Sequence, residues 1–148
     1  MSRLRKYLAL APAGRAIVLR SVLLLPVVAA LLRVRGMARM MALLVRLERL
    51  AEGVPDALSP QEIARLVNLT ASILGAPCLP RSLVLWHLLR CRGTSTEIRL
   101  GVSKLTDGNL AAHAWIDLDG QPLNDSVDVF DRYAAFSTSA TRIQVDRP

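Results

Sequence analysis

The stretch LAAHAWIDLDGQPLND, residues 110–125, predicts a β-strand, a tight turn and a segment that returns beside the strand. Its first nine residues alternate between two faces, with His113 and Trp115 on one face and Ala114 and Ile116 on the other. The Asp-Gly pair that follows is typical of the two-residue turn of a hairpin. We therefore expect an antiparallel pairing that carries a histidine on one of its faces.

A second strand precedes this hairpin, because residues 98–102 alternate between apolar and polar side chains. The segment KLTDGN, residues 104–109, supplies turn residues that connect the two strands. Further on, VFDRYAAF (129–136) and TRIQV (141–145) favour a short helix and a last strand. The second half of the chain is therefore expected to form an antiparallel sheet.

Two helices are expected before the strands. Ser59, the proline after it and Glu62 form a capping box, which is a strong helix start, and Gly75 ends that helix. The second helix is leucine-rich, follows Cys78 and ends near Gly93. Helices that precede an antiparallel sheet define an α+β fold.

Residues 1–58 form a basic, apolar front end that we expect to be helical. The apolar run between Arg20 and Arg33 holds twelve residues, fewer than the roughly twenty that a membrane-spanning helix needs. A secretory signal would place its apolar run directly behind the basic start, but Arg15 and Arg20 intervene here, and further alternation of apolar and basic residues follows. Two interpretations stay open: helices kinked at Pro26 that pack on the core and on a partner protein, or peripheral attachment to an anionic membrane.

The composition narrows the class of protein. A net charge of +7 suits nucleic acid, lipid or acidic partners, but an aromatic content of only 4% offers few rings for stacking on bases, so no nucleic-acid partner is expected. Two cysteines without a C-x-x-C pair argue against a disulfide framework or a zinc site and favour the cytoplasm. Residues 59–148 then form the core domain behind the front end.

Cys78 is expected at the mouth of the second helix, between Pro77 and Pro80. A thiol in this position meets unpaired backbone N–H groups and the positive end of the helix dipole, which favour the thiolate over the thiol. The same N–H groups, including that of Cys78 itself, can hold the oxyanion of an acyl-transfer intermediate. The position therefore predicts a catalytic nucleophile.

A thiolate nucleophile needs a base that later protonates the leaving group, and the chain has only two histidines. His87 lies inside the leucine-rich helix, where we expect it to pack, so His113 is the better base. Asp117 shares the strand face of His113 but lies about 13 Å along the strand. Asp125 returns after the turn to within one residue of the position opposite His113, and we expect it to orient the imidazole.

A non-catalytic interpretation stands beside this one, because cysteine is often a small buried residue. Cys91 is the competing thiol, but it lies near the C-terminus of the helix, at the wrong end of the dipole. Trp115, on the same face as His113, either forms a wall of the site or packs in the core.

The segments CLPRSLVLWHLLRCRG and GVSKLTDGNLAAHAWIDLDGQPLND together resemble the transglutaminase-like cysteine peptidases that process lasso-peptide precursors in bacterial gene clusters. The combination of C-L-P-R-S-L, A-H-A-W and the D-G turn carries the resemblance. It implies a papain-like core with an antiparallel sheet and a Cys-His-Asp triad. That triad falls on Cys78, His113 and Asp125, the residues reached above from their chemistry.

The resemblance also implies the reaction and the partners. Such a peptidase cleaves the leader from a ribosomally made precursor, and a separate ATP-dependent cyclase joins the freed amine to an acidic side chain. Residues 1–58 favour helices rather than a small winged, strand-containing domain, so we expect the chain to act with a separate leader-recognition protein. No cofactor and no metal are expected, and because no G-x-x-x-x-G-K-[ST] motif is present, any nucleotide dependence would come from a partner.

Two other functions stay open at this point. One is an acyltransferase that uses the same three residues. The other is a non-catalytic, basic adaptor that holds a complex at a membrane or a partner through residues 1–58.

Overall fold

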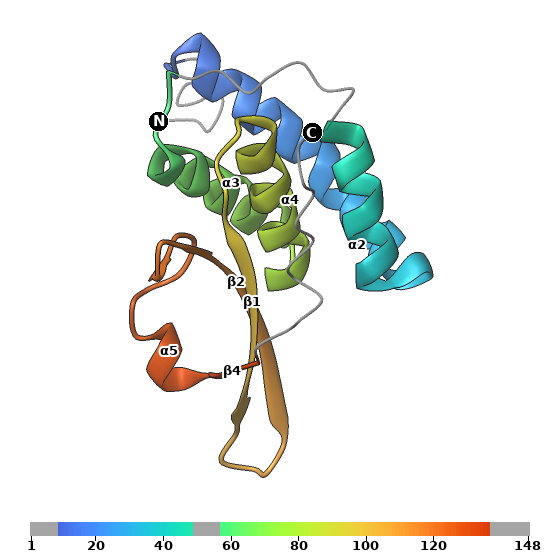
Figure 1. Ribbon diagram of the computed structural model, residues 1–148, viewed down its shortest axis with the longest axis vertical. Coiled ribbons are helices and arrows are strands. Elements are labelled where there is room, and N and C mark those ends of the chain that lie inside the picture. The colour runs from blue at the N-terminus through green and yellow to red at the C-terminus, as the bar shows by residue number, and fades with distance from the viewer. Residues whose placement is uncertain (1–8, 49–56, 137–148) are drawn as a thin grey trace.

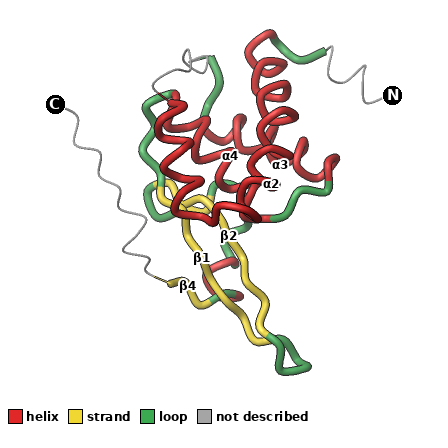
Figure 2. The backbone as a smooth tube through the Cα atoms, turned by 90° about the vertical axis from the view of Figure 1, so that its right-hand side faces the viewer, coloured by secondary structure: helices red, strands yellow, loops and turns green. Residues whose placement is uncertain are grey.

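The computed structural model describes residues 9–48 and 57–136. The helices between residues 12 and 91 gather at one end of the molecule, and an antiparallel hairpin extends away from them (Figure 1, Figure 2). Helices therefore precede an antiparallel sheet, and the fold is α+β, as the sequence patterns predict.

The first described helix, α2, spans Pro12–Glu48 and stays helical through Pro26. Its dihedral angles leave the helical region at Gly36, with φ 73° and ψ 171°. The interruption that we expected at Pro26 thus falls at Gly36 instead. Proline keeps φ near the helical value, whereas a positive φ with an extended ψ suits only glycine.

Helix α3 spans Pro60–Leu74 and begins at the predicted capping box. The Glu62 N–H donates to Ser59 Oγ at 3.2 Å, and the Ser59 N–H donates to Glu62 Oε2 at 2.7 Å. Gly75 follows in the left-handed conformation, φ 65°, and closes the helix. Local sequence chemistry therefore sets both ends of α3.

Helix α4 spans Cys78–Cys91 and starts three residues after Gly75. Its C-cap is Arg92, and Gly93, the expected cap, follows one position later with φ 81°. The Gly93 N–H donates to the Arg90 carbonyl at 2.8 Å, so the glycine still helps to end the helix.

The sheet has four strands in the order β3-β2-β1-β4. The strands are β1 (Glu97–Lys104), β2 (Leu110–Leu118), β3 (Gln121–Pro122) and β4 (Ala134–Phe136), and the one-turn helix α5 (Val129–Arg132) precedes β4. All neighbouring strands in this order are antiparallel: β3 with β2, β2 with β1, and β1 with β4. The strand expected at residues 141–145 lies outside the described residues.

The register of the sheet places the turn where the sequence predicts it. Gly101 pairs with His113, and Leu118 pairs with Gln121. Asp119 and Gly120 both have positive φ, 53° and 81°, as the two-residue hairpin turn requires. The chain after this turn therefore runs back along β2 toward His113.

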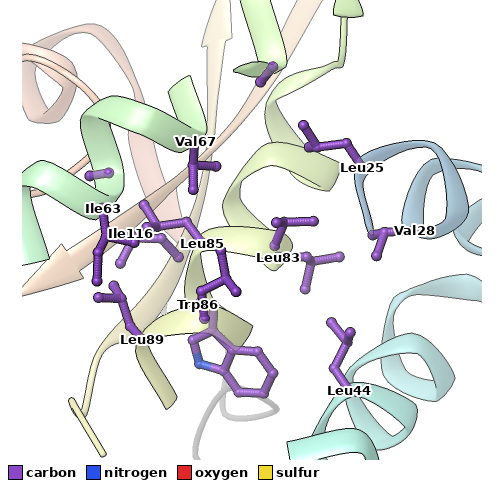
Figure 3. Packing of buried hydrophobic residues seen from close by; sticks show 14 of the residues in the cluster. Leu25, Val28, Leu44, Ile63, Val67, Leu83, Leu85, Trp86, Leu89 and Ile116 are labelled. Atoms are coloured by element: carbon purple, nitrogen blue, oxygen red, sulfur yellow. The ribbon is translucent and has the colours of Figure 1, made fainter. Parts of the chain in front are cut away.

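The hydrophobic core lies between the helices and one face of the sheet (Figure 3). Leu83 and Leu85 of α4 pack there with Ile116 of β2. Leu25 and Leu44 show that α2 contributes to the same core, although the predicted boundary at residue 58 would set this helix apart. The division into residues 1–58 and 59–148 stays a prediction.

Helix α2 is also the one helix among the described residues that is long and apolar enough to cross a membrane, by length and composition. A core helix of a soluble protein or a signal sequence meets the same criterion. Because α2 buries Leu25 and Leu44 against the rest of the protein, one of its faces is occupied by protein rather than by lipid.

Candidate active site

Cys78 is the first residue of α4, with Pro77 as the N-cap. The first backbone hydrogen bond of the helix joins the Arg81 N–H to the Pro77 carbonyl at 3.2 Å. The N–H groups of Cys78 and Leu79 precede this bond, and Pro80 has none to lose. A half-buried free thiol therefore stands beside backbone donors that the helix does not use.

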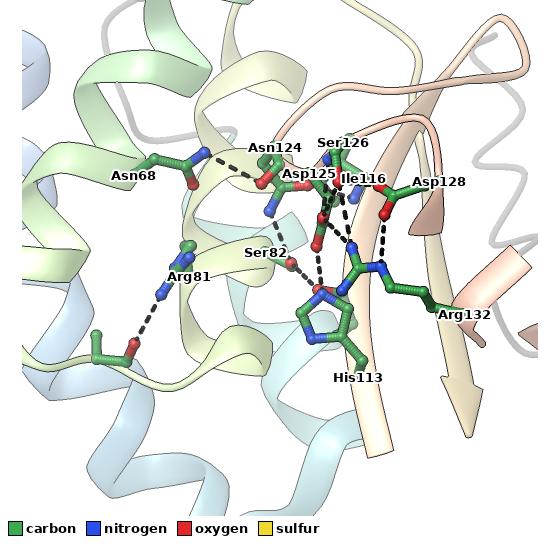
Figure 4. A network of polar contacts seen from close by, with 12 residues as sticks. Asn68, Arg81, Ser82, His113, Ile116, Asn124, Asp125, Ser126, Asp128 and Arg132 are labelled. Atoms are coloured by element: carbon green, nitrogen blue, oxygen red, sulfur yellow. Dashed lines mark hydrogen bonds and ion pairs between the residues drawn. The ribbon is translucent and has the colours of Figure 1, made fainter. Parts of the chain in front are cut away.

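His113 lies in β2, and its ring stacks on that of Tyr133 with centroids 4.9 Å apart. The Nε2 atom of His113 is hydrogen-bonded to Oδ2 of Asp125, which returns after the Asp119 turn (Figure 4). The predicted contact between this histidine and this aspartate is thus present.

Asp125 has further partners at its other carboxylate oxygen. Oδ1 accepts the Ser126 N–H at 2.8 Å and Nη2 of Arg132 at 3.0 Å. Burial by itself raises the pKa of Asp125, but the hydrogen bonds from His113 and Ser126, together with the charge of Arg132, outweigh burial and lower it. Asp125 is therefore a carboxylate at neutral pH.

The charge of Asp125 assigns the tautomer of His113. A carboxylate only accepts hydrogen bonds, so Nε2 of His113 carries the proton that Asp125 binds. In the neutral ring Nδ1 then keeps its lone pair, and it has no hydrogen-bond partner among the described residues. Nδ1 is thus the atom of His113 that can take up a proton.

Aromatic side chains back the His113 face of the sheet. Trp115 is fully buried, and its ring meets Phe130 edge to face at 5.8 Å and His113 at 6.1 Å. Gly101, opposite His113 in β1, makes room for them, because a Cβ there would lie 2.9 Å from the Tyr133 Cβ and 3.0 Å from the Trp115 ring. Trp115 therefore packs beside the histidine.

A chain of neutral hydrogen bonds joins α4 to β2 close to His113 (Figure 4). Ser82, one turn after Cys78, donates to the Ala114 carbonyl at 3.0 Å and accepts Nδ2 of Asn124 at 3.0 Å. Asn124 Oδ1 accepts the Ile116 N–H at 2.7 Å. Ser82 is completely buried and Asn124 is 8% exposed, so these bonds are shielded from water.

Asn68 of α3 completes this chain of bonds, because its Nδ2 donates to the Asn124 carbonyl at 3.1 Å. The residue after Asn124 is Asp125, and the residue before Ala114 is His113. The network thus joins the Cys78 helix, at Ser82, to the direct neighbours of His113 and Asp125. No hydrogen bond joins Cys78 itself to His113 in the described part of the chain.

Sequence reasoning did not find Ser82, Asn124 or Arg132. The position of Asn124 directly before Asp125 is the one local signal for its role. Ser82 is four residues after Cys78 and therefore lies on the same side of α4. Arg132 comes from α5, and no pattern in the sequence links that helix to the hairpin.

Cys91 and His87 form a separate pair at the other end of α4. Cys91 Sγ lies 3.6 Å from Nε2 of His87, which is 5% exposed. Burial lowers the pKa of His87 and raises the pKa of Cys91, so both are neutral near pH 7. A neutral thiol is a poor nucleophile, and the expectation that His87 packs in the helix is confirmed.

No group of three or more His, Cys, Asp or Glu side chains within residues 9–48 and 57–136 is arranged to hold a metal ion. The candidate residues supply a thiol, an imidazole, a carboxylate and backbone N–H donors. Those groups suit nucleophilic attack on an acyl carbon.

A model of the transglutaminase-like superfamily matches residues 22–138, which is most of the chain. The chain therefore belongs to the transglutaminase-like superfamily. No curated protein and no solved structure matches it. Membership of this superfamily suggests a cysteine-protease or acyl-transfer activity.

Proposed function

We propose that this protein is a cysteine endopeptidase that removes the leader peptide from a lasso-peptide precursor. Superfamily membership supports a cysteine-protease or acyl-transfer chemistry, and the motif resemblance around Cys78, His113 and Asp125 supports the substrate. The observation that carries the proposal is the hydrogen bond from His113 to a charged Asp125. The His113 strand is joined to the Cys78 helix by the hydrogen bond from Ser82 to the Ala114 carbonyl.

In the first half of the reaction, Nδ1 of His113 takes the thiol proton of Cys78, and the thiolate attacks the carbonyl carbon at the leader–core junction. The oxyanion that forms accepts a hydrogen bond from the Cys78 N–H. The C–N bond then breaks, and the imidazolium returns its proton to the amine of the released core peptide. The leader remains on Cys78 as a thioester.

In the second half, His113 takes a proton from water, and the hydroxide attacks the thioester carbonyl. The C–S bond breaks, the leader leaves as a carboxylic acid that loses its proton to solvent, and the imidazolium returns its proton to the Cys78 thiolate. Asp125 stays ionised throughout, because its role is to hold Nε2–H of His113 and to stabilise the imidazolium.

The partners follow from the proposed reaction. The leader region of the precursor would be presented by a separate leader-recognition protein, and the ATP-dependent cyclase would use the freed amine. The reaction belongs in the cytoplasm, where thiols stay reduced. An acyltransferase on the same three residues is the second candidate, and it is favoured if an added amine captures the thioester faster than water does.

Mass spectrometry of the precursor, incubated with this protein and the leader-recognition protein, tests the proposal. The natural protein should release the leader, and Cys78→Ala should lower the rate by at least about 10³-fold. Cys91→Ala is the matched control, because Cys91 lies on the same helix, and it should retain activity.

Release of the leader at the natural rate by Cys78→Ala would rule out this nucleophile. If the folded natural protein binds the recognition protein and leader but releases nothing, the non-catalytic adaptor becomes the better account. A leader–amine adduct formed in place of the hydrolysed leader would favour the acyltransferase.

A further inference from the structure

Helix α2 is apolar on two opposite faces. One face contributes Ile17, Leu25 and Val28 to the core. The other carries an exposed stripe, defined here as Leu19, Val22, Leu23, Val27 and Val34. Leu23 is 62% exposed and Val34 is 81% exposed. Only 22% of the most apolar 18-residue window of this helix is buried.

A helix that is apolar on all sides is ordinarily covered on all sides, by protein or by lipid. The exposed stripe lacks such a cover in the described part of the chain. From Leu19 to Val34 it measures about 22 Å along the helix axis. This is a continuous surface rather than a scatter of single exposed side chains.

The charge of α2 selects what would cover the stripe. Between Pro12 and Leu47 there are six arginines and no aspartate or glutamate. Arg33 and Arg35 are exposed on either side of Val34 at the end of the stripe, and Arg39 is exposed after the break at Gly36. None of the three forms an ion pair with another described residue. The complementary surface is therefore anionic around an apolar interior.

Two other covers fit less well. A second copy would bring the same unopposed arginines against each other, which costs electrostatic energy. A protein interface is usually anchored by aromatic side chains and hydrogen bonds, whereas the stripe is entirely aliphatic. A bilayer interface requires only apolar area and nearby cations.

We propose that the exposed stripe is a membrane-surface docking site, at which α2 lies along the interface of an anionic phospholipid bilayer. Leu23, Val27 and Val34 enter the acyl boundary, while Arg33 and Arg35 reach the headgroups. The helix lies on the membrane and does not span it, because Ile17 and Leu25 on its other face are part of the protein core. This proposal does not depend on the peptidase activity.

Vesicle flotation of the full-length protein tests the proposal, because bound protein rises with the vesicles whereas aggregated protein sinks. The protein should float with vesicles of phosphatidylcholine and phosphatidylglycerol, and far less with phosphatidylcholine alone. Leu23→Glu combined with Val27→Glu should lower the bound fraction at least about tenfold. Arg33→Gln and Arg35→Gln should each weaken binding about fivefold.

The matched control is Leu69→Glu combined with Ile73→Glu on α3. These residues have the same i, i+4 spacing, and they are 54% and 48% exposed, so the substitutions add equal charge at comparable apolar positions. The control should float like the natural protein. An equal loss in the control, or equal binding of the natural protein to both vesicle types, would overturn the proposal.

Absence of flotation with the anionic vesicles would also overturn it. Light scattering after size exclusion then tests whether a second copy of the protein covers the stripe. In that case the natural protein is a dimer, and Leu23→Glu combined with Val27→Glu converts it to a monomer. The two arginine variants keep the test valid if the glutamate variant fails to fold, because they alter only exposed charges.

Discussion

Each carboxylate oxygen of Asp125 has its own partners, and this division fixes the orientation of the carboxylate. Oδ2 binds Nε2 of His113, while Oδ1 accepts hydrogen bonds from the Ser126 N–H and from Arg132. The carboxylate cannot rotate away from the imidazole without losing the bonds at its other oxygen. At the residue scale, Arg132 therefore supports His113 through Asp125.

Asp125→Asn should remove a pH-dependent part of the stability. The folded-state pKa of Asp125 is lowered, so its contribution is complete above the unfolded-state pKa of about 3.9 and is lost as the pH falls through the lower folded-state pKa. In urea titrations, the free energy of unfolding of the natural protein should fall more steeply than that of the variant between about pH 5 and about pH 3.

Two other carboxylates with lowered pKa values, Glu62 and Asp107, do not contact Asp125 through a hydrogen bond, are present in both proteins and serve as an internal control. Equal slopes in the two proteins would contradict the account of Asp125.

The sequence predicts the contact of His113 with Asp125 because the Asp-Gly turn is short and fixes the register over a few residues. It does not predict the contact of Arg132 with Asp125. Arg132 reaches back from α5, and the conformation of the loop between them follows from tertiary packing rather than from a repeating pattern.

At the scale of elements, the relation between α4 and β2 depends on polar groups as well as on the apolar core. Asn124 bridges Ser82 of α4 and the Ile116 N–H of β2, where the short strand β3 has already ended. Its side chain continues the edge pairing that β3 leaves unfinished. The bridge holds the Cys78 helix and the His113 strand at a fixed separation.

Asn124→Ala should lower the free energy of unfolding by about 1–3 kcal/mol, because it leaves the buried Ile116 N–H unpaired. Ser82→Ala should cost a similar amount, and the double variant should cost less than the sum because the two side chains share a bond. If the bridge positions the site, folded Asn124→Ala should also cleave the precursor with a lower kcat and an unchanged KM.

Asn68→Ala is the matched control for this prediction. It removes one hydrogen bond to the Asn124 carbonyl and leaves the bonds that Asn124 makes to Ser82 and β2 in place, so it should affect stability more than kcat. A natural kcat in folded Asn124→Ala would show that the bridge serves stability alone.

The elements also differ in how far the sequence determines them. Both ends of α3 follow from local chemistry, the capping box at Ser59 and the left-handed Gly75, and both were predictable. The sequence predicts a break of α2 at Pro26, because proline is the stronger local signal. The helix instead breaks at Gly36, where the backbone adopts a positive φ that suits glycine. The bridge through Asn124 joins residues 42 apart, beyond the reach of any local pattern.

At the scale of the whole molecule, α2 is part of the fold and also carries a long uncovered apolar face. The superfamily match begins at residue 22, inside α2, and this helix buries Leu25 and Leu44 in the common core. Its opposite face carries the exposed stripe. One helix thus completes the domain on one side and provides the proposed docking surface on the other.

The central claim is that Cys78 is activated by His113, and the alkylation rates of the two thiols test it without any substrate. Iodoacetamide, followed by peptide mass spectrometry of the folded protein, should modify Cys78 at least about tenfold faster than Cys91 at neutral pH, because burial raises the pKa of Cys91. His113→Ala should lower the rate at which Cys78 is modified. His87→Ala, the control at the other end of α4, should leave the Cys78 rate unchanged. Faster modification of Cys91, or a Cys78 rate that does not change in His113→Ala, would contradict the account.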